Sequence, residues 1–137
     1  MGCTALHRYL EERNVSEVNT AFIGYLANLC NIAAQNPAIA SAIVKELQDQ
    51  RGYLKLIASE NYSSYATQMS MANLLTDKYA EGSPYHRFYA GCDNVDFIEK
   101  RAVDLVKKIF NAEHAYVQPH SGADANLMAY WAIIHTR

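Results

Sequence analysis

The sequence predicts an α/β fold that is mostly helical over its 137 residues. Apolar residues recur every three or four positions in the N-terminal region and again after Cys92, which is typical of amphipathic helices. The segment Tyr116–Trp131 has the pattern of a strand, a turn and a helix, the unit from which α/β proteins are built. Hydrophobic residues make up 50% of the chain, enough for a sizeable core.

Two helices are expected in the N-terminal region. Apolar residues at spacings of three and four define the first: Phe22, Leu26, Leu29, Cys30 and Ala33. We expect Ser16 to be its N-cap. Asn36 and Pro37 interrupt the pattern, and a second apolar stripe then runs to Gly52. Such stripes are usually packing faces, although a partner-binding surface would have the same pattern.

A third helix and a loop are expected next. Tyr65–Leu75 has the composition of a helix, with Ser63 or Ser64 as its cap. Lys78–Cys92 is rich in glycine, proline and aromatic residues and has no helical period. We therefore predict an ordered loop there.

The clearest amphipathic helix follows this loop. Its apolar face consists of Val95, Ile98, Ala102, Leu105, Val106, Ile109 and Phe110. On its solvent side the spacing predicts two i,i+4 ion pairs, Asp96 with Lys100 and Asp104 with Lys108. These pairs would stabilise the exposed face of the helix.

The region around Pro119 is the first feature with chemical meaning. His114–Gln118 predicts a short strand, Pro119 ends it, and a helix starts at Ser121. A hydroxyl, exposed N–H groups and the small Gly122 at a helix start suit a phosphate or carboxylate. A capping box of Ser121 with Asp124 explains the same residues without a ligand. The spacing leaves both interpretations open.

The loop Lys78–Cys92 is the second candidate site. It holds one carboxylate, three phenols, one imidazole and one guanidinium within fifteen residues. Groups of this kind transfer protons and form hydrogen bonds, so the loop could line a site. A solvated loop whose aromatic side chains cover a neighbouring face is the alternative. Six of the ten tyrosines lie between Tyr53 and Tyr89, which favours a lined pocket or an interface.

Charge and composition argue against several other functions. The chain has 12 basic and 14 acidic residues and a net charge of −2, which does not suit nucleic acid. The apolar run Ala21–Ala34 is too short to span a membrane. The five histidines form no metal-ligand pattern, so no metal is expected. The three separated cysteines predict reduced thiols, and the absence of a targeting signal favours the cytoplasm.

Four segments together resemble the serine hydroxymethyltransferase family in order and spacing. They are Leu56–Tyr62, Leu75–Gly82, Arg87–Asp96 and Val117–Gly122. The resemblance runs from about Glu46 to the end of the chain. Residues 1–45 would then form an N-terminal helical extension, 46–92 an N-terminal arm with the active-site and interface loop, and 93–137 the start of the large cofactor-binding domain.

The resemblance implies a fold-type I enzyme that uses pyridoxal 5′-phosphate, with this chain at the N-terminal end of the large domain. Such an enzyme reversibly transfers a one-carbon unit from serine to tetrahydrofolate, giving glycine and methylenetetrahydrofolate. It also implies a homodimer whose active sites are shared across the interface. The loop would then serve the partner subunit's site.

The family's residue roles carry over to matching positions. Glu81 and Tyr89 would be catalytic and would also contact the substrate, together with Ser59. Glu81 would handle protons near the serine hydroxymethyl group and folate, so a dry pocket that keeps it protonated is expected. Tyr89 would lie beside the adduct of substrate and cofactor. The residues near the cofactor's phosphate would be Tyr79, Ser121, Gly122 and Ala123.

The sequence also departs from the family's pattern. Ala123 and Asp124 stand where serine and glutamine are common, and Phe88 replaces a frequent tyrosine. The family's Schiff-base lysine lies beyond the matching segments, so the 137-residue chain alone is expected to be inactive. A noncatalytic helical interaction module derived from the enzyme is an alternative. Another fold-type I enzyme, such as an aminotransferase, would explain the serine–glycine turn but not the segments Tyr79–Glu81 and Phe88–Cys92.

Overall fold

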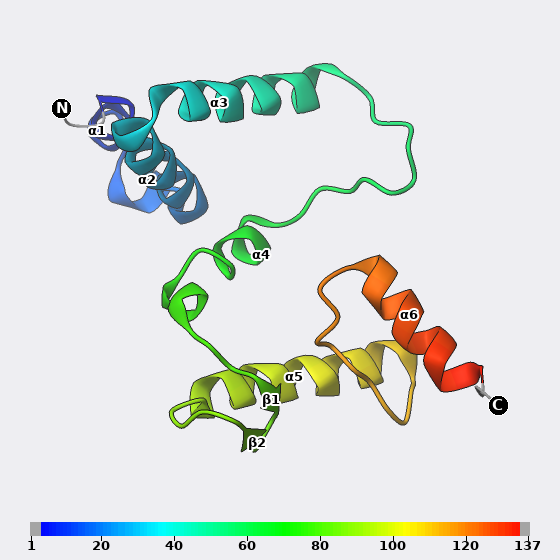
Figure 1. Ribbon diagram of the computed structural model, residues 1–137. Helices are drawn as coiled ribbons and strands as arrows, with labels where there is room; N and C mark the ends of the chain where they lie inside the picture. The colour runs from blue at the N-terminus through cyan, green and yellow to red at the C-terminus, as the bar shows by residue number, and fades with distance from the viewer. Residues whose placement is uncertain (1–3, 135–137) are drawn as a thin grey trace. The chain divides into compact units, whose positions relative to one another are not determined.

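The computed structural model describes residues 4–134 and contains two compact units, Met1–Asn73 and Leu74–Arg137 (Figure 1). Helices dominate both units, as the sequence predicts. No helix among residues 4–134 has the length and apolar content needed to cross a membrane.

The N-terminal unit is built from helices. They are α1 (Thr4–Glu11), the 3₁₀ helix η1 (Val15–Glu17), α2 (Thr20–Gln35), α3 (Pro37–Gly52) and α4 (Tyr65–Met69). The ring of Tyr9 on α1 meets Phe22 on α2 edge-on, with centroids 4.8 Å apart. Tyr25 on α2 meets Tyr65 on α4 in the same way at 6.4 Å. Aromatic contacts therefore connect α2 to both α1 and α4.

Two asparagines start the long helices of this unit. The Asn19 side chain accepts a hydrogen bond from Phe22 N at 3.0 Å and caps α2. The prediction of Ser16 as the cap is wrong, because Ser16 lies within η1 and Asn19 is the residue that reaches the first turn. Asn36 ends α2 and caps α3, with Pro37 at the start of the helix, where a missing N–H costs nothing.

Helix α4 is shorter than the predicted Tyr65–Leu75 and ends at Met69. Ser64, one of the two expected caps, accepts a hydrogen bond from Thr67 N at 3.2 Å. The Ser70 hydroxyl then donates to Thr67 O at 2.7 Å. A serine side chain that bonds the backbone in this way competes with helix propagation, which accounts for the early end.

The C-terminal unit places a hairpin before two helices. Its elements are the 3₁₀ helix η2 (Leu74–Asp77), β1 (Gly82–Ser83), β2 (His86–Arg87), α5 (Asp93–Phe110) and α6 (Gly122–Ile133). The strands pair antiparallel, with Gly82 opposite Arg87 and Ser83 opposite His86. Tyr85 in the turn has a φ of 65°. The predicted ordered loop therefore contains a short hairpin that composition did not indicate.

The predicted amphipathic helix is confirmed as α5, which ends at a left-handed Asn111 with a φ of 50°. The predicted strand at His114–Gln118 is wrong, since this segment has irregular backbone. A strand needs a neighbouring strand for its ladder of hydrogen bonds. Among the described residues, strand pairing joins β1 and β2 alone, and the Gln118 side chain bonds to the hairpin instead.

Few residues are buried within the described part of the chain. They are Ala40, Cys92 and Asp96. Large apolar side chains such as Phe110 and Trp131 are exposed, so the core of these residues is small. Cys92 is a free thiol that donates to Tyr89 O at 3.4 Å. Cys30 is disulfide-bonded, so the expectation of reduced thiols is wrong for Cys30.

Candidate active site

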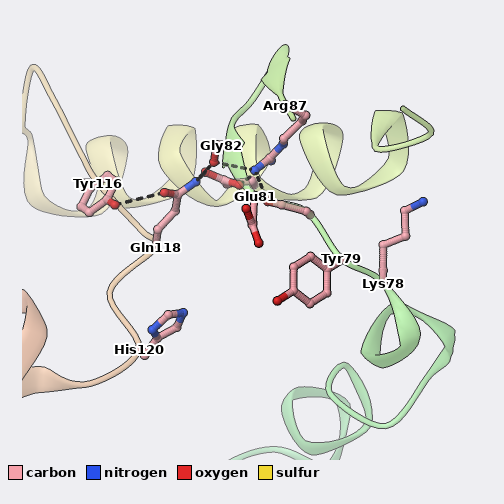
Figure 2. A pocket seen from close by; sticks show the side chains of 10 residues that line it. Lys78, Tyr79, Glu81, Gly82, Arg87, Tyr116, Gln118 and His120 are labelled. Carbon is pink, nitrogen blue, oxygen red and sulfur yellow. Dashed lines mark hydrogen bonds and ion pairs between the residues drawn. The ribbon is translucent and has the colours of Figure 1, made fainter. Parts of the chain in front are cut away.

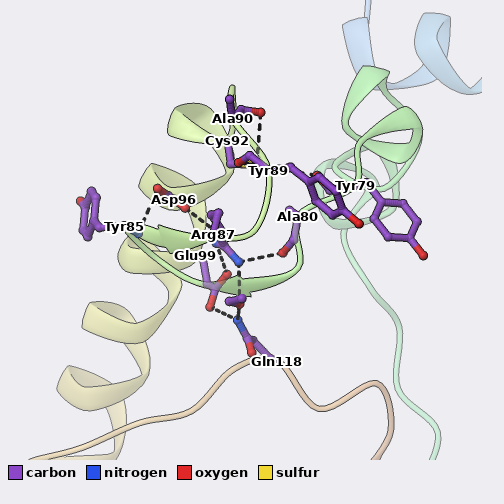
Figure 3. Close-up of polar contacts among 11 residues, drawn as sticks. Tyr79, Ala80, Tyr85, Arg87, Tyr89, Ala90, Cys92, Asp96, Glu99 and Gln118 are labelled. Carbon is purple, nitrogen blue, oxygen red and sulfur yellow. Dashed lines mark hydrogen bonds and ion pairs between the residues drawn. The ribbon is translucent and has the colours of Figure 1, made fainter.

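The hairpin of the C-terminal unit is held by the guanidinium of Arg87 (Figure 3). Arg87 Nε donates to Asp96 Oδ1 at 2.7 Å, and Nη2 donates to Glu99 Oε2 at 2.6 Å. Its Nη1 donates to the carbonyls of Ala80 and Gly82, both at 2.9 Å. Two hydrogen bonds from this rigid, planar group therefore fix the backbone on both sides of Glu81, and the other two bind the group to α5.

The carboxylates that orient Arg87 come from α5. The side chains of Arg87 and Asp96 are 5% and 7% exposed, and that of Glu99 is 16% exposed. The second oxygen of Asp96 accepts from Tyr85 N at 3.0 Å, which anchors the hairpin turn to the helix. The hydrogen bond from Arg87, assisted by that from Tyr85, holds the pKa of Asp96 below its usual value although burial opposes this.

The predicted solvent-side pair of Asp96 with Lys100 is wrong because Asp96 points into this network. Lys100 Nζ bonds instead to Asp104 Oδ1 at 2.5 Å, and no ion pair among the described residues joins Asp104 to Lys108. The i,i+4 rule identifies which residues share a helix face. It does not show that Asp96 will pair with a guanidinium from another segment in place of Lys100.

A cavity of about 530 Å³ adjoins the hairpin (Figure 2). It is lined by Lys78, Tyr79, Ala80, Glu81, Gly82, Arg87, Glu99, Tyr116, Gln118 and His120. The Tyr79 hydroxyl, the Glu81 carboxylate and the His120 ring point toward a common space, whereas the Lys78 side chain extends away from it. A phenol, a carboxylate and an imidazole facing one space can bind and relay protons.

The structure brings some of the predicted site residues together. Tyr79 and Glu81 line the cavity, and Tyr89 meets Tyr79 edge-on with ring centroids 5.9 Å apart. Glu81 is exposed, so residues 4–134 do not provide the dry pocket that was expected around it. Ser59 belongs to the N-terminal unit, and its position relative to the cavity is not defined.

The remaining predicted residues form the start of α6, immediately after His120. Ser121 caps the helix, because its hydroxyl oxygen accepts from Asp124 N at 3.1 Å. The first N–H groups of a helix, here those of Gly122 and Ala123, have no carbonyl partner within it. No heavy atom lies within 4 Å of the position where a side chain on Gly122 would begin, so the turn is open.

The start of α6 therefore fits the phosphate of the implied cofactor. The Ser121 hydroxyl accepts one hydrogen bond and can still donate its own hydrogen to an anion. The positive end of the helix dipole adds to this attraction. Asp124 carries a negative charge in the same turn and opposes it.

Sequence reasoning did not identify Glu99 and Gln118, and it gave no role to Arg87 or His120. A carboxylate three residues after Asp96 was the available signal, since both would share one face of α5. Gln118 gave no such signal. Its partners Glu99 and Gly82 lie 19 and 36 residues away in the chain.

The fold and site together define a mostly helical segment in which proton-transfer groups lie next to a helix start able to hold an anion. The model of one family, serine hydroxymethyltransferase, matches residues 32–137. The chain belongs to this family. The match begins before Glu46, so the family likeness extends further toward the N-terminus than the four segments indicated.

Curated serine hydroxymethyltransferases align over nearly the whole chain. The protein from Treponema pallidum is 63% identical over 134 residues, covering 98% of this chain and 23% of its own length. The protein from Chlamydia trachomatis is 54% identical over 132 residues, covering 94% of this chain and 26% of its own. The chain thus spans about a quarter of the length of these relatives, and these alignments include most of the region expected to be an extension.

Proposed function

We propose that the complete protein containing this chain is a serine hydroxymethyltransferase. It would reversibly transfer a one-carbon unit from serine to tetrahydrofolate, giving glycine and methylenetetrahydrofolate. Family membership supports this proposal. The observation that carries it is that one chain provides both an ordered loop with an exposed Glu81 carboxylate and the open, Ser121-capped start of α6.

In this proposal the start of α6 holds the phosphate of pyridoxal 5′-phosphate through Ser121, Gly122 and Ala123. When bound, the cofactor supplies an electron sink for the bond that breaks. Tyr79 would support the phosphate, and Glu81 would move protons at the serine hydroxymethyl oxygen and at folate. Serine contacts include Ser59 and Tyr89.

We further propose a cytoplasmic fold-type I enzyme with an α/β large domain. Its homodimer would place the Tyr79–Tyr89 loop in the partner subunit's site. Dimers made from one Glu81→Gln chain and one chain lacking the cofactor lysine would contain one intact site, so about half of the wild-type activity should return. Mixed dimers that stay inactive would mean that the loop serves its own subunit.

The function is tested in the complete protein with Glu81→Gln. Loss of a positioned proton-transfer group should slow tetrahydrofolate-dependent serine cleavage by about 10²–10⁴-fold. Binding of pyridoxal 5′-phosphate, followed by its absorbance, should persist. Glu113→Gln is the matched control, because Glu113 is an exposed carboxylate outside the cavity lining.

Two results would contradict the proposal. One is Glu81→Gln activity within a factor of two of wild type. The other is a complete protein that binds no pyridoxal 5′-phosphate, which would favour the noncatalytic module instead.

A further inference from the structure

The Gln118 side chain has an unusually complete set of partners. Its Nε2 donates to Gly82 O at 2.8 Å and to Glu99 Oε1 at 2.7 Å. Its Oε1 accepts from the Tyr116 hydroxyl at 3.0 Å. Both amide hydrogens and the amide oxygen are therefore engaged, which specifies the orientation of the group.

These bonds fix the backbone that carries Glu81. The carbonyls of residues 80, 81 and 82 all accept hydrogen bonds. Arg87 binds the first and third, and Phe88 N donates to Glu81 O at 3.1 Å. Arg87 and Phe88 belong to the hairpin itself, whereas Gln118 comes from the segment that leads into α6 (Figure 3).

Gln118 thus connects two segments of the chain that lie 36 residues apart in sequence. One is the loop with Tyr79 and Glu81. The other is the segment that leads into α6, which begins four residues after Gln118. The loop is therefore held in place by its own chain, whichever subunit's site it enters.

We propose that Gln118 is a positioning residue that holds the Glu81-bearing loop in the geometry with which it enters an active site, that of the partner subunit in the proposed dimer. This inference rests on the proposed function. An amide suits this position because it donates to two acceptors and accepts from the Tyr116 hydroxyl at the same time. A glutamate would set a carboxylate against Glu99 and the carbonyl of Gly82, and an alanine would leave both without this donor.

The test uses Gln118→Ala and Gln118→Glu in the complete protein. A displacement of about 1 Å can lower a rate by about 10²-fold, so we expect kcat for serine and tetrahydrofolate to fall by about that factor. The affinity for pyridoxal 5′-phosphate should stay within about threefold, because Ser121 caps α6 without help from Gln118. Gln50→Ala is the matched control, since Gln50 bonds to Glu46 on the exposed surface of α3.

A second readout does not depend on activity. Amide hydrogen exchange at residues 80–88 should accelerate about tenfold in Gln118→Ala, as expected for the loss of a hydrogen bond to a part-buried carbonyl, and not in Gln50→Ala. The wild-type protein could lack hydroxymethyltransferase activity while exchange at residues 80–88 still accelerates in Gln118→Ala. In that case the proposed function fails and the positioning role stands.

Other outcomes overturn the positioning role itself. If the wild-type protein is active, one such outcome is a kcat of Gln118→Ala within twofold of the wild-type value. Another is a cofactor affinity that falls in proportion to kcat, which would indicate general damage. If neither Gln118 variant folds, Tyr116→Phe decides, because it removes the hydroxyl that orients the amide. Its kcat should fall about threefold to tenfold for one lost hydrogen bond, and an unchanged kcat contradicts the proposal.

Discussion

The two units of this chain reach order by different means. In the N-terminal unit, the side chains of Asn19, Asn36 and Ser64 cap helices through bonds to residues two or three positions away. In the C-terminal unit, Arg87 and Gln118 bind partners up to 36 residues away in a part-buried network. The first kind of order is local and modular, whereas the second depends on several segments at once.

This difference has a consequence for function. A helix cap can be lost without disturbing the neighbouring helix, because each cap satisfies only its own first turn. A network that shares donors and acceptors fails together, since each lost partner leaves others unsatisfied. The residues proposed to handle protons lie in the C-terminal unit, where hydrogen bonds from several segments constrain their backbone.

The largest expected effect is that of replacing Arg87, compared with an arginine of the N-terminal unit. Arg87→Ala in the complete protein should raise amide exchange at residues 80–88 by about 10–10²-fold, the factor for losing one hydrogen bond to a charged group. Arg87→Lys should behave similarly, because lysine lacks the planar fork. Arg13→Ala is the control, since Arg13 lies over the Tyr9 ring, 5.7 Å from its centroid. Amide exchange around Arg13 should change less than about fivefold in this control. Equal changes around Arg13 and at residues 80–88 would contradict the difference between the units.

Glycine provides the next comparison. Gly82 has a φ of 104°, and an added side-chain carbon would lie 2.3 Å from His86 O. Gly82→Ala should therefore lower the free energy of unfolding by about 1–3 kcal/mol, as for other strained backbone positions. Gly52 at the end of α3 has open space around it, and Gly52→Ala should be neutral or stabilise by up to about 1 kcal/mol. Urea unfolding of the complete protein measures both, and equal effects would contradict the comparison.

The same contrast explains how far the sequence could predict this structure. Residues 20–52 show their helices through apolar spacing, and Asn36 with Pro37 marks the junction. The hydroxyl at the start of α6 was also predictable, because capping is local. The Arg87 network was not, since Asp96 has an equally good local partner in Lys100 and only the fold decides between them. The strand predicted at 114–118 failed for the same reason, as strand pairing is a tertiary property.

Acid should affect the C-terminal unit through Asp96. Because Arg87 lowers the pKa of Asp96, this carboxyl stabilises the fold fully above its ordinary value of 3.8 and loses that contribution as pH falls through the lower folded pKa. We expect the Tyr85 amide resonance to shift at a pH below 3.8 as its bond to Asp96 weakens. Asp96→Asn should remove that titration, and a Tyr85 shift that persists in the variant would assign it to another group.

In the N-terminal unit, Lys45 gives stability the opposite dependence on pH. The hydrogen bond from Lys45 to Asp49 raises the pKa of Lys45. Its contribution is present below the ordinary value of 10.5 and is lost as pH rises through the folded pKa. Because this pair is exposed, we expect alkali to change stability much less through Lys45 than acid does through Asp96. Lys45→Met, compared with wild type by unfolding at alkaline pH, tests this.

The last comparison concerns the cap of α3. Asn36 accepts hydrogen bonds from Ala38 N at 3.1 Å and Ile39 N at 3.4 Å, so Asn36→Ala should lower the free energy of unfolding by about 1 kcal/mol. Asn31, exposed within α2, is the matched control. Asn31→Ala should be neutral or slightly stabilising, because alanine has the higher helix propensity. Amide exchange in the two variants then sharpens the comparison. If order in this unit is modular, Asn36→Ala should loosen the first turn of α3 and leave residues 80–88 unchanged, and a loosened hairpin would show that the units are coupled after all.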